Sequence, residues 1–113
     1  MIRTGEQYME GLRAPREVYV GGERVEDVTT YAPFRKPIES YARLYDRKHN
    51  PEHQDVLSYV ADDGERYDIS FMVPKSKEDL KRKGRAFNNF SAASYGCLGR
   101  GPESMAALVA GLS

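Results

Sequence analysis

The chain has 113 residues and a mass of 12.8 kDa, which is enough for a single domain over residues 1–113. Its 17 Lys and Arg balance its 17 Asp and Glu, and this neutrality argues against a protein that binds nucleic acid or a membrane surface. One cysteine excludes an internal disulfide framework, and the longest apolar stretch, residues 105–109, is too short to span a bilayer. The N-terminus shows no signal peptide, so we expect a cytoplasmic protein.

A short helix and a β-hairpin are predicted at the start of the chain. Thr4 and Gln7 have the spacing of a capping box, and Pro15 ends the helical pattern that follows them. Two β-prone runs, residues 18–20 and 23–25, then flank two glycines that can adopt positive φ angles. This pattern predicts a tight hairpin, which must pack on another element because an isolated hairpin is unstable.

A second helix and a second hairpin are expected in the middle of the chain. Apolar residues recur at helical spacing before Pro51, at Ile38, Tyr41, Ala42, Leu44 and Tyr45. Pro33 and Pro37 should break the approach to this helix into a short turn. Strand-like runs at residues 56–60 and 67–71 flank the turn cluster at residues 62–65, and this order predicts a hairpin.

The C-terminal third predicts two more helices. Ser76 and Asp79 form a second capping box, which opens a helix with an apolar face of Leu80, Ala86, Phe87, Phe90 and Ala93. Its charged residues Lys77, Lys81, Arg82 and Arg85 should face water. The last helix, from Pro102 through Leu112, is apolar around most of its circumference and needs burial on several sides. A chain that stops at Ser113 can hardly supply that burial, which suggests a domain that belongs inside a larger assembly. The expected fold class is mainly helical α+β with two short β-hairpins.

Most of the residues that could carry chemistry have a simpler interpretation. His49 and His53 are four apart, but Pro51 interrupts any shared helix, so we expect a solvated loop and no metal site. The acidic residues 62–65 fit a turn better than a cation loop. The glycine-rich run at residues 96–101 follows a helix where a dinucleotide-binding loop would follow a strand.

Arg100 is the sharper candidate. It lies two residues before Pro102, where the last helix should begin, and glycines flank it on both sides. A fixed cation beside a helix N-terminus favours an anionic ligand atom, such as a phenolate, carboxylate or flavin oxygen. The alternative is a surface salt bridge, which is the commoner role of an arginine near a helix start.

Several separated segments resemble the N-terminal domain of the 4-hydroxyphenylacetate 3-hydroxylase family, in the same order and at similar spacing. These segments are residues 3–8 (Arg-Thr-Gly-Glu-Gln-Tyr), residues 18–30 (Val-Tyr-Val-Gly-Gly-Glu-Arg-Val-Glu-Asp-Val-Thr-Thr) and residues 42–46 (Ala-Arg-Leu-Tyr-Asp). Residues 99–103, Gly-Arg-Gly-Pro-Glu, stand where the family commonly reads Gly-Arg-Ser-Pro-Asp-Tyr.

The resemblance implies a flavin-dependent aromatic monooxygenase component with an acyl-CoA dehydrogenase-like N-terminal helical domain. Members of this family take reduced FAD from a separate reductase, form a flavin C4a-hydroperoxide and hydroxylate an aromatic, phenol-like substrate. Their flavin site is built mostly by a middle β-barrel domain and a C-terminal helical domain, and we expect these domains to lie outside this chain. We therefore expect a small subunit or N-terminal portion that is inactive alone, and whose flavin-binding remainder lies on a second polypeptide in a hetero-oligomer. The alternative is a non-catalytic helical docking or regulatory module derived from the family.

The resemblance also assigns the site residues. Arg100 matches the family arginine that lines the substrate pocket, where it would be a catalytic and substrate-binding residue that stabilises a phenolate. Ser104 falls at the family's tyrosine and is the second substrate-binding candidate, although its hydroxyl is too short to reach the same point. No residue of this chain is assigned to flavin binding or to a metal. A related family, the 4-hydroxybutyryl-CoA dehydratases, holds an iron–sulfur cluster with cysteines in this segment, but Cys97 stands alone here and is expected to be a small buried hydrophobe.

Overall fold

The computed structural model describes residues 2–97 and 102–112. Within them the chain forms two compact units: an N-terminal unit, Arg3–Arg47, and a C-terminal unit that begins at Lys48. The expected single domain over residues 1–113 stays a prediction. Both units are mainly helical, and each carries one small two-stranded antiparallel sheet, which confirms the predicted fold class. Among the described helices, none combines the length and the apolar character that a membrane span requires.

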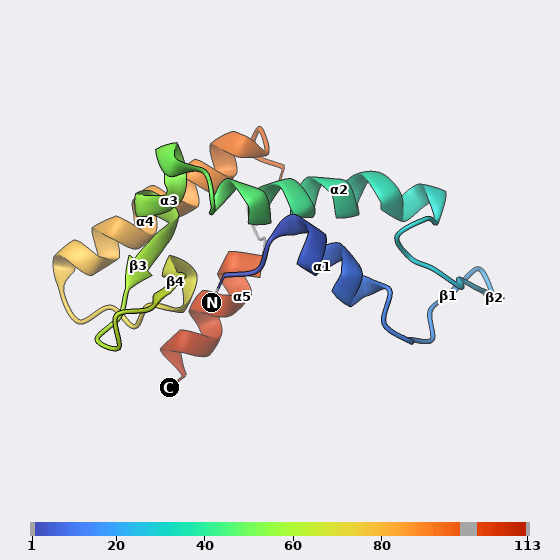
Figure 1. Ribbon diagram of the computed structural model, residues 1–113, viewed down its shortest axis with the longest axis horizontal. Coiled ribbons are helices and arrows are strands. Elements are labelled where there is room, and N and C mark those ends of the chain that lie inside the picture. Colours follow the sequence, from blue (N-terminus) through green and yellow to red (C-terminus); the bar gives the residue numbers. More distant parts are fainter. Residues whose placement is uncertain (1, 98–101, 113) are drawn as a thin grey trace. The chain divides into compact units, whose positions relative to one another are not determined.

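The N-terminal unit contains α1 (Gly5–Leu12), β1 (Tyr19–Val20), β2 (Glu23–Arg24) and α2 (Ala32–Arg47) (Figure 1). The predicted capping box is present: Thr4 Oγ1 accepts the Gln7 N–H at 3.2 Å, and the Gln7 side chain accepts the Thr4 N–H at 3.0 Å. The hairpin between the two strands is also confirmed. Gly21 and Gly22 turn it at φ angles of 60° and 87°, which residues with a Cβ rarely adopt.

The break expected before the second helix is absent, because α2 begins at Ala32 and continues through Pro37. Pro33 is the second helical residue, where the backbone N–H would have no partner within the helix. Pro37 removes one hydrogen bond, but the first turns of α2 pack on a hydrophobic cluster, which favours a continuous helix. The cluster has a buried centre and a partly buried rim, made by Val25, Val28 and Ile38 with Tyr8, Met9, Leu12, Val18, Tyr31 and Phe34.

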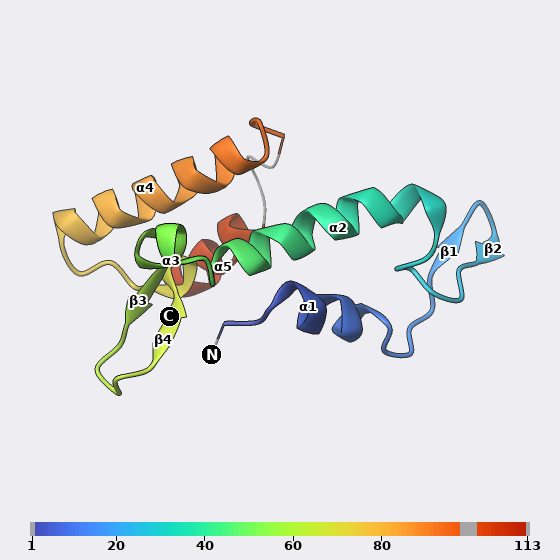
Figure 2. The same cartoon turned by 45° about the horizontal axis from the view of Figure 1, so that its top comes forward.

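Helices α1 and α2 lie side by side at close range (Figure 2). The Gly5 N–H donates to Asp46 Oδ1 at 2.7 Å, and the rings of Tyr8 and Tyr45 stack with centroids 4.8 Å apart. A Cβ at Gly5 would lie only 2.5 Å from the Ala42 carbonyl oxygen. The absence of a side chain at Gly5 therefore sets how closely the two helices approach.

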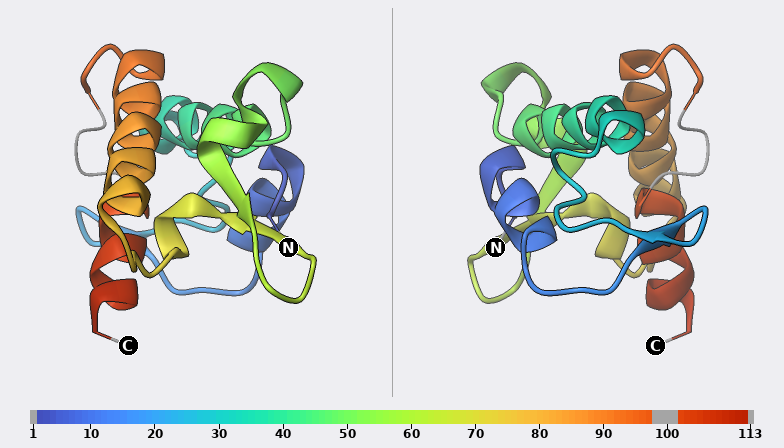
Figure 3. Two further views of the ribbon diagram at one scale, coloured as in Figure 1. Left: turned by 90° about the vertical axis from the view of Figure 1, so that its left-hand side faces the viewer. Right: turned by 90° about the vertical axis from the view of Figure 1, so that its right-hand side faces the viewer.

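The C-terminal unit contains α3 (Pro51–Leu57), β3 (Ser58–Val60), β4 (Arg66–Asp68), the 3₁₀ helix η1 (Ile69–Phe71), α4 (Lys77–Ala93) and α5 (Pro102–Gly111). The chain can be followed from β4 through η1 into α4 in Figure 3. Strands β3 and β4 pair with Tyr59 opposite Tyr67. The buried apolar residues of this unit come from every helix in it: Leu57, Ile69, Met72, Ala86, Phe90, Ala106 and Ala110.

The second hairpin is confirmed, but both of its predicted strands are too long. Val56 and Leu57 are helical, because Pro51 begins α3 and the Asn50 side chain caps it by accepting the Glu52 N–H at 2.9 Å. At the other end, Asp68 accepts the Ser70 N–H at 2.9 Å, and this contact turns residues 69–71 into η1. Leu57 is fully buried, so the first two residues of the predicted strand at 56–60 are the end of a helix in the core.

Helix α4 begins after Ser76 as predicted, but the Asp79 side chain accepts the Lys75 N–H at 3.0 Å, and the apolar face differs from the expected one. Ser76 Oγ accepts the Asp79 N–H at 3.1 Å and caps the helix. Leu80 is 59% exposed, whereas Lys83 is buried together with Ala86 and Phe90. Positions 83, 86 and 90 recur at helical spacing, so a lysine lies on the buried stripe of α4, which the sequence analysis did not predict. The expectation that Leu80 and Phe87 face the core was wrong, since Phe87 is 36% exposed.

Candidate functional site

The predicted site residues belong to the segment where α5 begins. Arg100 lies outside the described residues, so its role stays a prediction. Ser104 is the third residue of α5 and is exposed. Its short hydroxyl is therefore accessible, as a substrate contact would require, but exposure alone assigns it no role.

In α5 the small apolar side chains are buried and the large ones are exposed. Ala106 and Ala110 are buried, and α5 contacts η1. The large apolar residues at the C-terminal end of the chain remain between 58% and 82% exposed, namely Met105, Leu108, Val109 and Leu112. This exposure agrees with the inference that the chain cannot cover its last helix by itself.

The chain leaves α4 through a left-handed turn. Tyr95 and Gly96 adopt φ angles of 52° and 79°, and the ring of Tyr95 is 96% exposed. A tyrosine in this region of φ is uncommon and needs local contacts to hold it. The Gly96 N–H donates to the Ser91 carbonyl at 2.8 Å, and the Cys97 N–H donates to the Ser94 carbonyl at 2.9 Å. Cys97 itself is exposed, so the expectation of a buried hydrophobe was wrong.

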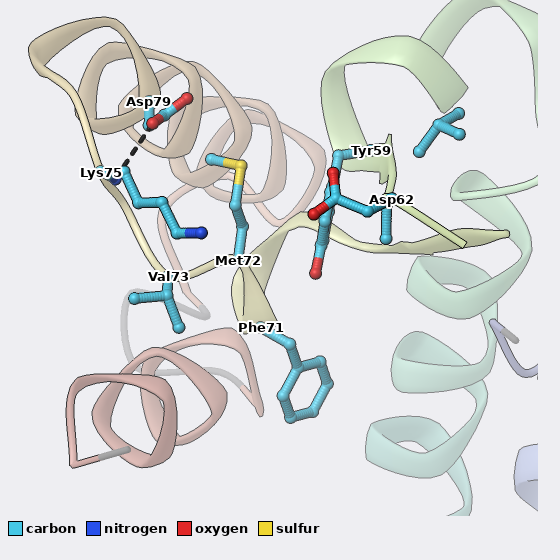
Figure 4. A pocket seen from close by; sticks show the side chains of 9 residues that line it. Tyr59, Asp62, Phe71, Met72, Val73, Lys75 and Asp79 are labelled. Carbon is cyan, nitrogen blue, oxygen red and sulfur yellow. Dashed lines mark hydrogen bonds between the residues drawn. The ribbon is translucent and has the colours of Figure 1, made fainter. Parts of the chain in front are cut away.

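A hollow of about 380 Å³ lies between β3, η1 and the start of α4. In Figure 4, Met72 points toward α4, and Phe71 points to the opposite side. Asp62 and Asp79 both line the hollow, and Asp79 accepts the Lys75 N–H at 3.0 Å. Lys75 lines the same hollow, so its positive charge opposes that of the two carboxylates, and the charge of the lining assigns the hollow no ligand.

Two lysines are buried beside η1. Lys48 is 3% exposed and pairs with Asp68, and its Nζ lies 5.1 Å from the centre of the Phe90 ring. Lys83 is 7% exposed, and its Nζ donates to the carbonyl oxygens of Ser70 at 3.1 Å and Met72 at 2.8 Å. Buried lysines are rare unless they are paired or hydrogen-bonded, as both are here.

The surroundings of Lys83 act on the pKa of its ammonium. Burial lowers the pKa of Lys83 below its usual value of 10.5, because the ammonium loses hydration, and the charge of Asp68 acts in the opposite direction. Sequence reasoning missed this residue because it interpreted the charges from Lys77 to Arg85 as the solvated face of the helix. The helical spacing of Lys83 from Ala86 and Phe90 was the available signal.

The two histidines do not share the environment that we expected. His49 is exposed, but His53 lies in α3 and is half-buried, with its Nδ1 3.5 Å from the Asn89 side-chain nitrogen on α4. The expected solvated loop is therefore wrong for His53. Over residues 2–97 and 102–112, His, Cys, Asp and Glu form no group of three or more that could hold a metal.

The acidic residues between β3 and β4 serve the turn, as predicted. Asp63 accepts the Glu65 N–H at 2.9 Å and the Tyr67 hydroxyl at 2.8 Å, and Gly64 has a φ of 80°. These two hydrogen bonds hold the pKa of Asp63 below its usual value, with the Glu65 N–H making the larger contribution. Asp63 is therefore engaged within the turn, where it stabilises the hairpin.

The charged residues of α4 face water for the most part. Lys77, Lys81 and Arg85 are exposed, and Arg82 is half-buried. Glu78 pairs with Lys81 at 3.6 Å and with Arg85 at 2.9 Å, which are surface ion pairs of small energetic effect. These residues form most of the solvated face of α4.

Comparison with known proteins identifies the family. Residues 4–113 match the family model described as the 4-hydroxyphenylacetate 3-hydroxylase N terminal. The chain is 42% identical over 110 residues to the oxygenase component of 4-hydroxyphenylacetate 3-monooxygenase from Thermus thermophilus, covering 96% of this chain and 23% of that protein. It is 47% identical over 89 residues to the oxygenase component of a 4-nitrophenol monooxygenase from Rhodococcus opacus, covering 79% of this chain and 17% of that protein.

A solved structure of the same kind supports the match in three dimensions. The oxygenase component of 4-hydroxyphenylacetate 3-monooxygenase, in complex with FAD and 4-hydroxyphenylacetate, superposes with a TM-score of 0.89 at 41% identity. The superposition covers 96% of this chain and 23% of that one, so the chain spans less than a quarter of the length of its relatives. The chain belongs to the 4-hydroxyphenylacetate 3-hydroxylase family, whose N-terminal part it represents.

Proposed function

We propose that the chain is the N-terminal part of a monooxygenase that uses reduced FAD to hydroxylate a phenol. The observation that carries this proposal is the likeness to the oxygenase complex with FAD and 4-hydroxyphenylacetate, at a TM-score of 0.89 over 96% of the chain. The relatives named for 4-hydroxyphenylacetate and 4-nitrophenol share one substrate feature, a phenolic hydroxyl. A phenol is therefore the substrate class that we assign.

The flavin-binding remainder is supplied outside this chain, on a second polypeptide, and a reductase supplies the reduced FAD. Bound reduced FAD provides the activated oxygen for such a hydroxylation. The exposed apolar side chains Met105, Leu108 and Val109 of α5 provide a surface that the remainder would cover.

This chain contributes Arg100 and Ser104 to the substrate side of the site. A guanidinium stays protonated at any working pH, so Arg100 stabilises a phenolate oxygen and makes the ring electron-rich without giving up a proton. Ser104, which is exposed at the start of α5, leaves more room than the family's tyrosine would at this position. The pocket therefore accepts a bulkier phenol than 4-hydroxyphenylacetate.

A chimeric oxygenase tests the proposal. This chain replaces the matching N-terminal segment of the Thermus thermophilus oxygenase, and hydroxylation of several phenols is measured with reduced FAD supplied. We expect FAD binding and hydroxylated product. A chimera that folds and binds FAD, but oxidises reduced flavin without hydroxylating any phenol, would contradict the assignment.

Substitution of Arg100 tests its role in the chimera. Arg100→Ala should lower turnover about 10²-fold or more, because a desolvated oxyanion loses its fixed cation. Arg100→Lys is the control: a structural salt bridge would survive it with activity largely kept, whereas a guanidinium that binds the substrate would not. Unchanged turnover in Arg100→Ala would end the assignment.

Ser104→Tyr tests the substrate preference in the same chimera. A phenol ring at position 104 fills the space that the serine leaves, so kcat/KM should shift toward 4-hydroxyphenylacetate and away from bulkier phenols. Measurement of kcat/KM for a matched pair of phenols gives the result. If the ratio of the kcat/KM values for the two phenols is the same in the chimera and in its Ser104→Tyr variant, Ser104 lies outside the substrate pocket.

The second candidate is a non-catalytic docking or regulatory module. The exposed apolar face of α5 favours it, because such a face suits a protein partner as well as a missing domain. Under this alternative the purified chain binds an oxygenase of the family without changing its FAD or substrate binding. Co-purification with the remainder, with activity present only in the complex, distinguishes the subunit from the module.

A further inference from the structure

We propose that Lys83 is a positioning residue that fixes α5, and with it Ser104, by holding the backbone of η1 from inside α4. The proposed function assigns no role to Lys83. The effect of Lys83 on substrate binding rests on the proposed function, whereas the effect of Lys83 on the position of α5 is independent of it.

The first step is the contact between Lys83 and η1. The Lys83 ammonium, 7% exposed, donates to the Ser70 carbonyl at 3.1 Å and to the Met72 carbonyl at 2.8 Å. The turn itself is closed by the Met72 N–H, which donates to the Ile69 carbonyl at 3.1 Å. Lys83 therefore binds the two carbonyls at the C-terminal side of η1, where a 3₁₀ turn leaves its acceptors without partners of its own.

The second step is the anchor at the other end of η1. Asp68 accepts the Ser70 N–H at 2.9 Å with Oδ1, while its Oδ2 binds the buried Lys48. The Lys48 ammonium lies over the Phe90 ring of α4. Asp68 and Lys48 therefore hold one end of η1, and Lys83 holds the other. Both sets of contacts involve charged groups that are shielded from water.

The third step leads from η1 to α5. The two elements are in contact, and the buried residues of α5 are Ala106 and Ala110, whose small side chains allow close approach. The backbone of α5 therefore packs closely on η1, so a displacement of η1 changes the surface on which Ala106 and Ala110 are buried. Ser104 lies one turn or less from Ala106 and moves with the helix.

Burial of a charged side chain in the core costs free energy, because the charge loses its hydration. Lys83 occupies the helical stripe of Ala86 and Phe90, where an apolar side chain would satisfy the packing of α4. An apolar side chain cannot bind the carbonyls of Ser70 and Met72, which would then be left unpaired. The two carbonyl contacts are therefore what a lysine supplies at this position and a leucine does not.

Hydrogen exchange on the full chain tests the structural part of the proposal. Lys83→Met, which keeps the length of the side chain and removes its donors, should speed amide exchange about tenfold or more in residues 69–72 and in α5. Lys81→Met is the matched control, because Lys81 is exposed on the same helix, and it should change neither segment. Amides of α1 and α2 report on a different unit and should not respond in either variant.

Exchange that rises in residues 69–72 but stays unchanged in α5 would overturn the proposal, as would unchanged exchange in both segments. Where Lys83→Met fails to fold, Lys83→Gln, which keeps a single donor group, takes its place with the same expectations. Lys83→Arg restores donors to both carbonyls and should return the exchange of α5 toward that of the unchanged chain.

Steady-state kinetics in the chimeric oxygenase test the link to substrate. Lys83→Met should raise the KM for the phenol about tenfold, with FAD affinity unchanged and kcat less affected than KM, and Lys83→Arg should recover most of the loss. An equal KM in Lys83→Met and the unchanged chimera would overturn this link. An inactive unchanged chimera would refute the proposed function alone, because the exchange experiment on the chain still decides whether Lys83 holds α5.

Discussion

The approach of α1 to α2 predicts opposite effects for two glycine-to-alanine substitutions in one helix. A Cβ at Gly5 would lie 2.5 Å from the Ala42 carbonyl oxygen and 2.6 Å from Asp46 Oδ2, whereas a Cβ at Gly11 would meet nothing within 4 Å. Both glycines belong to α1, and neither has a positive φ. The substitutions therefore differ in the space around the new methyl group.

The cost at Gly5 follows from these distances. An ordinary contact begins at 3.4 Å, so the helices must separate by about 0.9 Å to admit the methyl group. The same movement would stretch the hydrogen bond from the Gly5 N–H to Asp46, now 2.7 Å, past hydrogen-bond range. Overpacking and the loss of a bond to a charged acceptor together should destabilise the N-terminal unit by about 2–4 kcal/mol.

Gly11→Ala should instead stabilise the same unit by about 0.5–1 kcal/mol, because alanine favours the helix and nothing obstructs it. Urea unfolding followed by NMR at the amide signals of α1 and α2 reports on this unit. Asp46→Asn separates the two contributions, since it weakens the hydrogen bond without adding volume. Midpoints that move in the same direction for Gly5→Ala and Gly11→Ala would refute the reasoning.

Three further predictions concern stability. Gly84→Ala should raise the urea midpoint of the C-terminal unit by an amount equivalent to about 1 kcal/mol, because Gly84 lies inside α4 with open space around its Cα; a lower midpoint would show a contact there. Ser70→Ala should leave stability unchanged or raise it by about 1 kcal/mol, because the Ser70 hydroxyl is buried without a hydrogen-bond partner among the described residues, and thermal unfolding of the two proteins tests this. The pKa of Asp27 lies below its usual value, chiefly through the hydrogen bond from the Thr29 hydroxyl, so Asp27 stabilises the fold above pH 3.8 and loses this effect as the pH falls through its folded-state pKa. Asp27→Asn should flatten the fall in the urea midpoint as the pH drops below 3.8, and an unaltered pH profile would contradict the assignment.

The candidate site was predictable from the sequence only in part. The resemblance at residues 99–103 placed Arg100 and Ser104 at the start of the last helix, and the structure confirms that helix from Pro102 to Gly111. The buried charges of Lys48 and Lys83 were not predicted. A lysine in a run of charged residues gives no sign that its ammonium will reach two carbonyls on another element, because those carbonyls belong to residues more than ten positions away.

Local chemistry explains which elements the sequence determined by itself. The Thr4 capping box, the Gly21-Gly22 turn and the Ser76 cap depend on groups within about three residues, so their residue types alone predict them. The hydrogen bonds that define these features form in the structure as expected. They fix where helices and hairpins begin and end.

Long-range packing decided the remainder. Pro37 stays within α2, although proline disfavours a helix interior, since the first turns of α2 pack on the cluster of Val25, Val28 and Ile38. Leu57 ends a helix in the core although its neighbours resemble a strand, and Lys83 takes an inner position that its charge argues against. In each case the free energy of contacts formed in the folded unit exceeds a local preference, and only the tertiary structure contains those contacts.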